Sequence, residues 1–220
     1  MSAEPYKTSI SEYAEAFDSV RLAKNIFWLL IAAAIVVQLV CFVLVHFVGV
    51  TNQAAQLGAT QPASSASGWY HALHWIMPAV KFIALVSALL LMLTLMFAVK
   101  LSLLERMGGV AGLMSAFFWS LILFALLVPW QDVLAGSFAS GALYNLGELT
   151  DSKARLGDGW GNKVLFYARY AAYPVVTVLV WLVVQMKFGR GYRVIVSTLA
   201  AGAQKAAAAA EQSQQPQSEA

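Results

Sequence analysis

The sequence has few charged residues and almost no cysteine. Charged side chains make up 11% of the chain, and hydrophobic side chains make up 60%. Soluble domains carry about 25% charged residues, so this composition indicates a membrane protein. A single cysteine, Cys41, excludes an intramolecular disulfide, a CxxC redox pair and a cysteine cluster for zinc or iron–sulfur. Because Cys41 lies in an apolar run, we interpret it as a packing residue.

The sequence also lacks the short motifs of common enzyme classes. It contains no GxGxxG, no GxxxxGK[ST], no HExxH and no GxSxG. Its one HxxH, formed by His71 and His74, has no nearby glutamate to act as a base. Basic residues are sparse and adjoin the apolar runs, which gives no support to nucleic-acid binding. These absences favour a protein without catalytic activity.

Four long apolar runs are present, at about 26–50, 72–99, 108–130 and 164–187. A helix needs about 20 apolar residues to cross a bilayer, so each run is long enough. The first run is longer than the apolar part of a signal peptide and starts farther from the N-terminus. The predicted fold is therefore an all-α membrane protein, with a four-helix transmembrane bundle over residues 26–188.

The segments outside the four runs have different predicted characters. The connection 131–163 is expected to be an ordered outer loop, because it contains Trp, Tyr and Leu residues. Its apolar part, 133–149, is expected to form a short interfacial helix or a re-entrant segment. The Ala/Gln-rich tail 189–220 is expected to be partly disordered, although its alanine run favours a continued helix.

Residues 1–25 predict an amphipathic N-terminal helix. Tyr13, Phe17 and Val20 recur at helical spacing among charged residues. Two placements of this helix relative to the membrane fit the pattern. The helix either lies on the membrane surface or extends the first span into the cytosol.

The positive charges predict the orientation in the membrane. Lys and Arg occur before the first run, between the second and third runs, and at the start of the tail, whereas the first loop has none. Cytoplasmic segments are enriched in these residues. Both termini are therefore expected in the cytoplasm, with the chain in a bacterial inner membrane.

One helical face in the second run carries polar residues in its outer half. His71, His74, Pro78 and Lys81 follow one another at spacings of three, four and three, so they share a face. A charged residue inside a span usually faces the bundle interior or a wet cavity. Lys81 is expected to snorkel to the outer interface, to pair with Asp132, or to contribute to a ligand site.

The predicted topology collects the other polar side chains at the same outer pole. A pocket for an anionic or lipid-like ligand would use lysine as a point charge and arginine as a two-pronged donor. The candidate ligand-binding residues are His71, His74, Lys81, Asp132, Arg169 and Tyr173. His46, His71 and His74 are the candidate metal ligands, for a single haem or a metal ion. The inner half has no histidine, which excludes a two-haem electron carrier ligated by histidine.

Small residues mark a packing face at the start of the third run. Gly108, Gly112 and Ser115 share this face, and the two glycines have GxxxG spacing. Such residues let helix backbones approach closely in lipid. We expect packing within the chain, with dimerisation as the alternative.

These patterns favour a non-catalytic integral membrane subunit or scaffold of a larger assembly. Its expected partners are the lipid bilayer and other membrane proteins, or a second copy of itself, and the expectation is that it binds no cofactor. The alternative is a small membrane protein that binds a ligand, haem or metal at the outer pole, or a transporter component.

Overall fold

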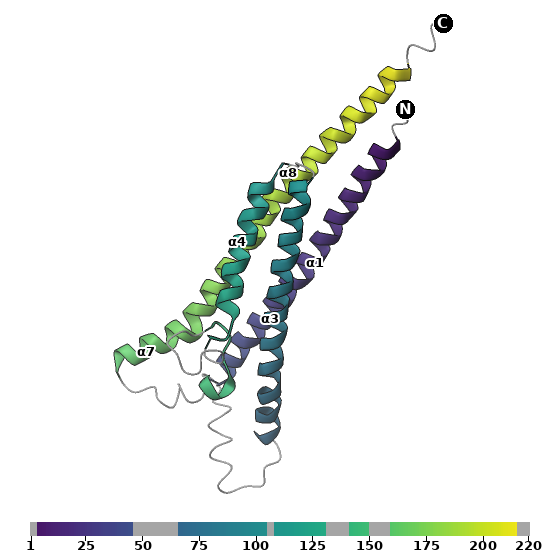
Figure 1. Ribbon diagram of the computed structural model, residues 1–220. Coiled ribbons are helices and arrows are strands. Elements are labelled where there is room, and N and C mark those ends of the chain that lie inside the picture. The colour runs from purple at the N-terminus through teal and green to yellow at the C-terminus, as the bar shows by residue number, and fades with distance from the viewer. Residues whose placement is uncertain (1–3, 46–65, 105–107, 131–140, 150–158, 215–220) are drawn as a thin grey trace.

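The computed structural model describes residues 4–45, 66–104, 108–130, 141–149 and 159–214 (Figure 1). Within these ranges the chain is helical, apart from short turns and an irregular stretch at 141–145. His46 and Asp132, two of the predicted site residues, lie outside the described residues.

Among the residues that the structure describes, four helices are long and apolar enough to cross a membrane, which is the predicted number of spans. They are α1 (Glu4–Val43), α3 (Ala66–Leu104), α4 (Val110–Leu127) and α8 (Tyr173–Gln214). The helix α7 (Trp160–Tyr167) and the π-helical turn η2 (Ala168–Ala172) lead directly into α8. The stretches that qualify as spans contain the predicted runs or most of each of them.

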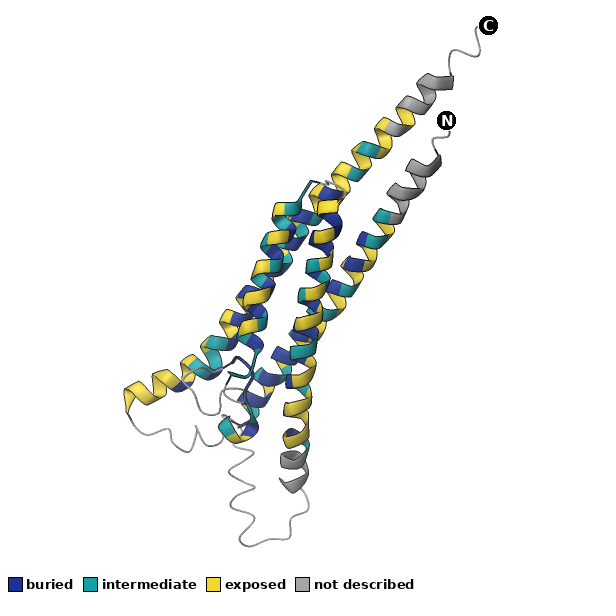
Figure 2. Ribbon diagram, viewed as in Figure 1, coloured by how far each residue is buried: buried dark blue, intermediate teal, exposed yellow. Residues whose placement is uncertain are grey.

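The four long helices surround one apolar core. Each packs against the next along the chain, and α1 also packs against α8, which closes the arrangement (Figure 1). The buried side chains that meet in the centre include Ile31, Leu91, Leu123 and Val184, one from each helix. Exposed residues run along the outside of the long helices (Figure 2). Many of them are large and apolar, as expected for a surface in contact with lipid.

Glycines bring α4 and α8 into backbone contact. A Cβ built on Gly112 would lie 2.8 Å from the Cα of Gly191, and one built on Gly191 would lie 2.9 Å from the backbone nitrogen of Leu113. Gly109 has a φ of 91°, and a Cβ there would lie 2.5 Å from the carbonyl oxygen of Gly191. The turn before α4 therefore needs a glycine for both its conformation and its closeness to α8.

Aromatic and polar side chains join α1 to α8. The rings of Trp28 and Trp181 stack with centroids 3.9 Å apart. Lys24 is buried, donates a hydrogen bond to Oε1 of Gln185, and lies 4.6 Å from the ring centroid of Phe188. The amide oxygen of Gln185 and the ring of Phe188 offset part of the cost of burying the charge of Lys24 among apolar side chains.

Both terminal helices are longer than the predicted spans. α1 has no break between its N-terminal part and the first span, and Phe17 and Val20 are buried in the main core. This is the geometry of a helix that extends the first span, and a position on the membrane surface stays a prediction. α8 continues through the alanine run of the tail as far as Gln214.

A change of helical register separates α7 from α8. The backbone N–H of Tyr173 donates to the carbonyl of Ala168, five residues earlier, as in a π-helix. The next residue, Pro174, has no N–H for the carbonyl of Tyr170. We attribute the π-helical turn to this proline. α7 veers away from the bundle at this point (Figure 1).

Candidate functional site

Residues 141–149, here called the inserted segment, enter the bundle between the helices. The backbone N–H of Ala142 donates to the carbonyl of Leu126 at 2.7 Å, at the end of α4. Gly141 lies so close to α4 that a Cβ would stand 2.0 Å from the carbonyl oxygen of Val128. The residues from 141 to 144 are buried, and 146–149 form one helical turn. The segment lies within the predicted apolar stretch 133–149.

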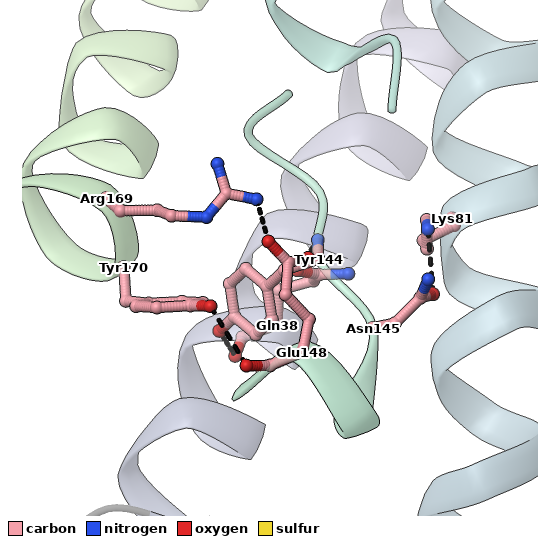
Figure 3. Close-up of polar contacts among 7 residues, drawn as sticks. All are labelled: Gln38, Lys81, Tyr144, Asn145, Glu148, Arg169 and Tyr170. Atoms are coloured by element: carbon pink, nitrogen blue, oxygen red, sulfur yellow. Dashed lines mark hydrogen bonds and ion pairs between the residues drawn. The ribbon is translucent and has the colours of Figure 1, made fainter. Parts of the chain in front are cut away.

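Lys81 holds the inserted segment to α3. Its side chain is buried, with 8% of its surface exposed, and Nζ donates to Oδ1 of Asn145 at 2.8 Å (Figure 3). The amide oxygen gives the ammonium group a polar partner inside the bundle, where an isolated charge would be costly. Asn145 belongs to the connection that also contains Asp132, and the predicted pairing of Lys81 with Asp132 lies outside the described residues.

Arg169 and Tyr170 hold the same segment to η2. The guanidinium group of Arg169 forms an ion pair with Glu148, and the two side chains are 21% and 26% exposed. The hydroxyl of Tyr170 donates to the backbone carbonyl of Glu148 at 3.2 Å (Figure 3). Because both residues belong to the π-helical turn, its register directs them to this segment.

Tyr144 anchors the segment to α1. Its hydroxyl donates to the backbone carbonyl of Gln38 at 2.7 Å, and its backbone N–H points to Oε1 of the same residue at 3.4 Å. Burial, with a smaller contribution from Cys41 and Tyr170, raises the pKa of the Tyr144 phenol, so the hydroxyl stays a proton donor. Nε2 of Gln38 is buried and has no hydrogen-bond partner among the described residues.

An aromatic cluster surrounds these polar contacts. The ring of Tyr170 lies 5.1 Å from that of Tyr144 and 4.9 Å from that of Phe166, measured between centroids. Phe42 of α1 contacts both Phe166 and Tyr170. These rings form a second core at the end of the bundle where the inserted segment lies. The segment is thus fixed by apolar packing as well as by hydrogen bonds.

The structure brings together only some of the predicted site residues. Lys81 and Arg169 bind residues 145 and 148 of the inserted segment, although they lie far apart in the sequence. His74 is exposed on α3, and its ring meets Trp75 edge-on at 6.2 Å. Tyr173 is half-buried and accepts a hydrogen bond at its carbonyl from the hydroxyl of Thr177.

The predicted metal site stays a prediction, because His74 is the one of its three ligands whose side chain the structure describes. His46 lies outside the described residues, and only the backbone of His71 is described. Among the described residues, no three His, Cys, Asp or Glu side chains come close enough to hold a metal ion. The arrangement that the structure describes is a network of hydrogen bonds and one ion pair.

Sequence reasoning missed several members of this network. Gln38, Asn145 and Glu148 are absent from the predicted site. The signal available was the spacing of Asn145 and Glu148, which places two polar side chains on one helical turn within an apolar stretch. A polar residue in the middle of the first span, Gln38, was a second signal.

The fold and the network define a class of protein. The chain is a helical integral membrane protein in which a connecting segment enters the bundle. No protein-family model, curated protein or solved structure matches it.

Proposed function

We propose that this chain is a non-catalytic integral membrane subunit or scaffold that attaches a partner protein through its two terminal helices. The outer pole, with the inserted segment, stabilises the bundle. The opposite end carries the attachment. The partner would be another protein of the same membrane assembly.

The observation that carries this proposal is the projection of α1 and α8 beyond the bundle at the same end (Figure 1). Gly108, at the start of α4, faces Val194 and Thr198 of α8. From 199 to 214 α8 continues past that level, which corresponds to about 24 Å at the rise of an α-helix. The described side chains at 200, 201, 203, 204 and 205 are exposed. We call α8 residues 199–214 the α8 arm.

The contacts that the buried cations make within the chain support a role without catalysis. Lys81 and Arg169 are the cations expected to bind a ligand, and both bind the inserted segment of their own chain. Their bonds join two helical segments, α3 and η2, to the inserted segment. These contacts account for charged side chains inside a membrane bundle without a substrate.

Exposed cations near the base of the arm support a cytoplasmic location for this end. Arg21, Lys100, Arg190 and Arg193 are exposed there, on three different helices. Such residues accumulate on the cytoplasmic side, where they also meet anionic lipids. The proposed location is a bacterial inner membrane with both termini in the cytoplasm.

The test is the composition of the complex extracted from native membranes in mild detergent. We would compare the full-length chain with the Ala203→Pro variant, because proline inside a helix costs about 3 kcal/mol and would break the exposed arm. Ala203→Ser is the matched control. We expect a stoichiometric partner protein with the wild type and with Ala203→Ser, and its loss with Ala203→Pro at equal membrane insertion.

Two outcomes would contradict the proposal. A wild-type chain that migrates alone at 23.8 kDa, or as an oligomer of itself only, is not a subunit of a larger assembly. A partner retained fully by Ala203→Pro would show that the arm is not its attachment.

A second candidate function rests on Gln38. Its buried Nε2 is a donor without a partner among the described residues, beside Tyr144 in the aromatic cluster. Buried donors usually have a partner, and a small ligand with an acceptor oxygen would supply one for Nε2. Mass spectrometry of the organic extract from gently purified protein, together with metal analysis and a search for a haem absorption band, would detect such a ligand. Its loss in Gln38→Leu would assign it to this position.

A further inference from the structure

An apolar groove lies on the outer face of α7, η2 and the beginning of α8. Its volume is about 770 Å³, and all of its lining residues come from this one continuous helical stretch. Ala168, Ala171 and Ala172 form its floor, with larger side chains before and after them along the stretch. These three alanines lie on the π-helical turn, where α7 veers away from the bundle (Figure 1).

The two ends of the groove differ in polarity. Trp160 and Lys163 line one end, and both are exposed. Val175 and Val176 line the other end, deeper along the bundle, and are also exposed. Trp residues concentrate where lipid headgroups begin, and a lysine attracts anionic headgroups. The groove thus has a cationic, interfacial mouth and an aliphatic interior.

The length of the aliphatic part matches one leaflet of a bilayer. Tyr167 to Val176 covers about 14 Å at the helical rise, and half of a hydrocarbon core is about 15 Å. A partner helix that crossed the membrane would need a surface through both leaflets. A single lipid needs only one leaflet.

We propose that this groove binds one phospholipid with an anionic headgroup. An acyl chain lies along the alanine floor, and the phosphate lies at the mouth beside Lys163. The side chains at Ala168 and Ala172 are exposed, so the bundle does not occupy the place of that acyl chain. This proposal is independent of the attachment of a partner through the α8 arm.

The experiment is native mass spectrometry of the full-length protein with added phosphatidylglycerol or phosphatidylcholine. We expect one phosphatidylglycerol per chain, bound about fivefold more tightly than phosphatidylcholine, as one lysine near a headgroup provides. Ala172→Leu fills the floor and should remove this tight binding. Ala79→Leu is its control, because Ala79 is an exposed alanine on α3.

A second pair of variants tests the headgroup. Lys163→Gln should make the two lipids bind equally, because it removes the charge at the mouth. Lys100→Gln removes an exposed charge at the other end of the bundle and should leave the preference unchanged. Both positions are on the surface, so neither change disturbs the core.

Three results would overturn the proposal. The wild type could show no preference for phosphatidylglycerol, or Ala172→Leu could bind it as well as Ala79→Leu does. Alternatively, Ala172→Cys in a Cys41→Ala background could form disulfide-linked dimers in excess lipid. That result would show that a second copy of the chain occupies the groove.

Discussion

Gly112 of α4 and Gly191 of α8 approach so closely that a Cβ built on Gly112 would lie 2.8 Å from the backbone nitrogen and the Cα of Gly191. Neither position has room for a methyl group unless the helices move apart. We predict that Gly191→Ala lowers the free energy of unfolding by about 1–3 kcal/mol, the usual cost of overpacking. Denaturation of the purified protein in mixed detergent would measure this change.

Gly189 provides the matched control, two residues earlier on the same helix. A Cβ there would have no atom within 4 Å. Gly189→Ala should therefore leave stability unchanged or raise it by about 0.5–1 kcal/mol through helix propensity. Equal effects of the two substitutions would contradict close packing between α4 and α8.

A second pair of glycines tests the entry of the inserted segment. A Cβ on Gly141 would lie 2.0 Å from the carbonyl oxygen of Val128, whereas one on Gly147 would have no neighbour within 4 Å. We predict that Gly141→Ala displaces the segment from α4 and lowers stability by about 1–3 kcal/mol. Gly147→Ala should have little effect. Hydrogen exchange at the backbone N–H of Ala142, which bonds to Leu126, should rise only in Gly141→Ala.

The ion pair between Arg169 and Glu148 can be measured by a double-mutant cycle. Arg169→Met and Glu148→Gln each remove one charge, and we expect a coupling energy of about 1–2 kcal/mol, because both side chains are mostly but not fully buried. Unfolding of the wild type, both single variants and the double variant gives this number. A coupling energy near zero would mean that the pair does not hold the segment.

Lys81 should restrain the inserted segment through Asn145. Lys81→Met keeps the length and apolar stem of the side chain but removes the donor at 2.8 Å from Oδ1 of Asn145. We predict faster hydrogen exchange within residues 141–149 and no change at the start of α4. Lys100→Met, at an exposed position, is the control. Unchanged exchange in Lys81→Met would indicate that this lysine only snorkels.

The orientation in the membrane can be tested with single cysteines. Asn162 and Ala203 are both exposed and lie on α7 and on the α8 arm. In a Cys41→Ala background, a maleimide that cannot cross membranes should label Asn162→Cys on intact spheroplasts. Ala203→Cys should react only after the membrane is opened. The reverse pattern would contradict cytoplasmic termini.

The hydropathy pattern of the sequence was sufficient to predict the spans. A long uncharged run in a bilayer must satisfy its backbone hydrogen bonds internally, and an α-helix does so. The runs around Ile31, Leu91, Leu123 and Val184 are each helical in the structure, and their apolar side chains meet in one core. The lengths of the terminal helices were less predictable. Hydropathy detects where a helix is apolar, whereas α8 continues through alanines whose preference for helix does not depend on lipid.

The candidate site was predictable only in part. Lys81 and Arg169 could be identified as candidates from the sequence, because a charge inside a span is costly. Their partners, Asn145 and Glu148, lie 64 and 21 residues away in the sequence. No local pattern states which polar residue of a long connection meets a given helix, since that depends on where the connection enters the bundle.

The sequence by itself determined that this is a helical protein of the membrane. Its composition and the lengths of its four apolar runs are those of helices that are solvated by lipid. The tertiary structure alone decided that residues 141–149 enter the bundle and that Gly191 is the neighbour of Gly112. It also decided that the turn before Pro174 directs Arg169 and Tyr170 to one segment. These are contacts between distant parts of the chain, and they depend on backbone closeness and helical register rather than on hydropathy.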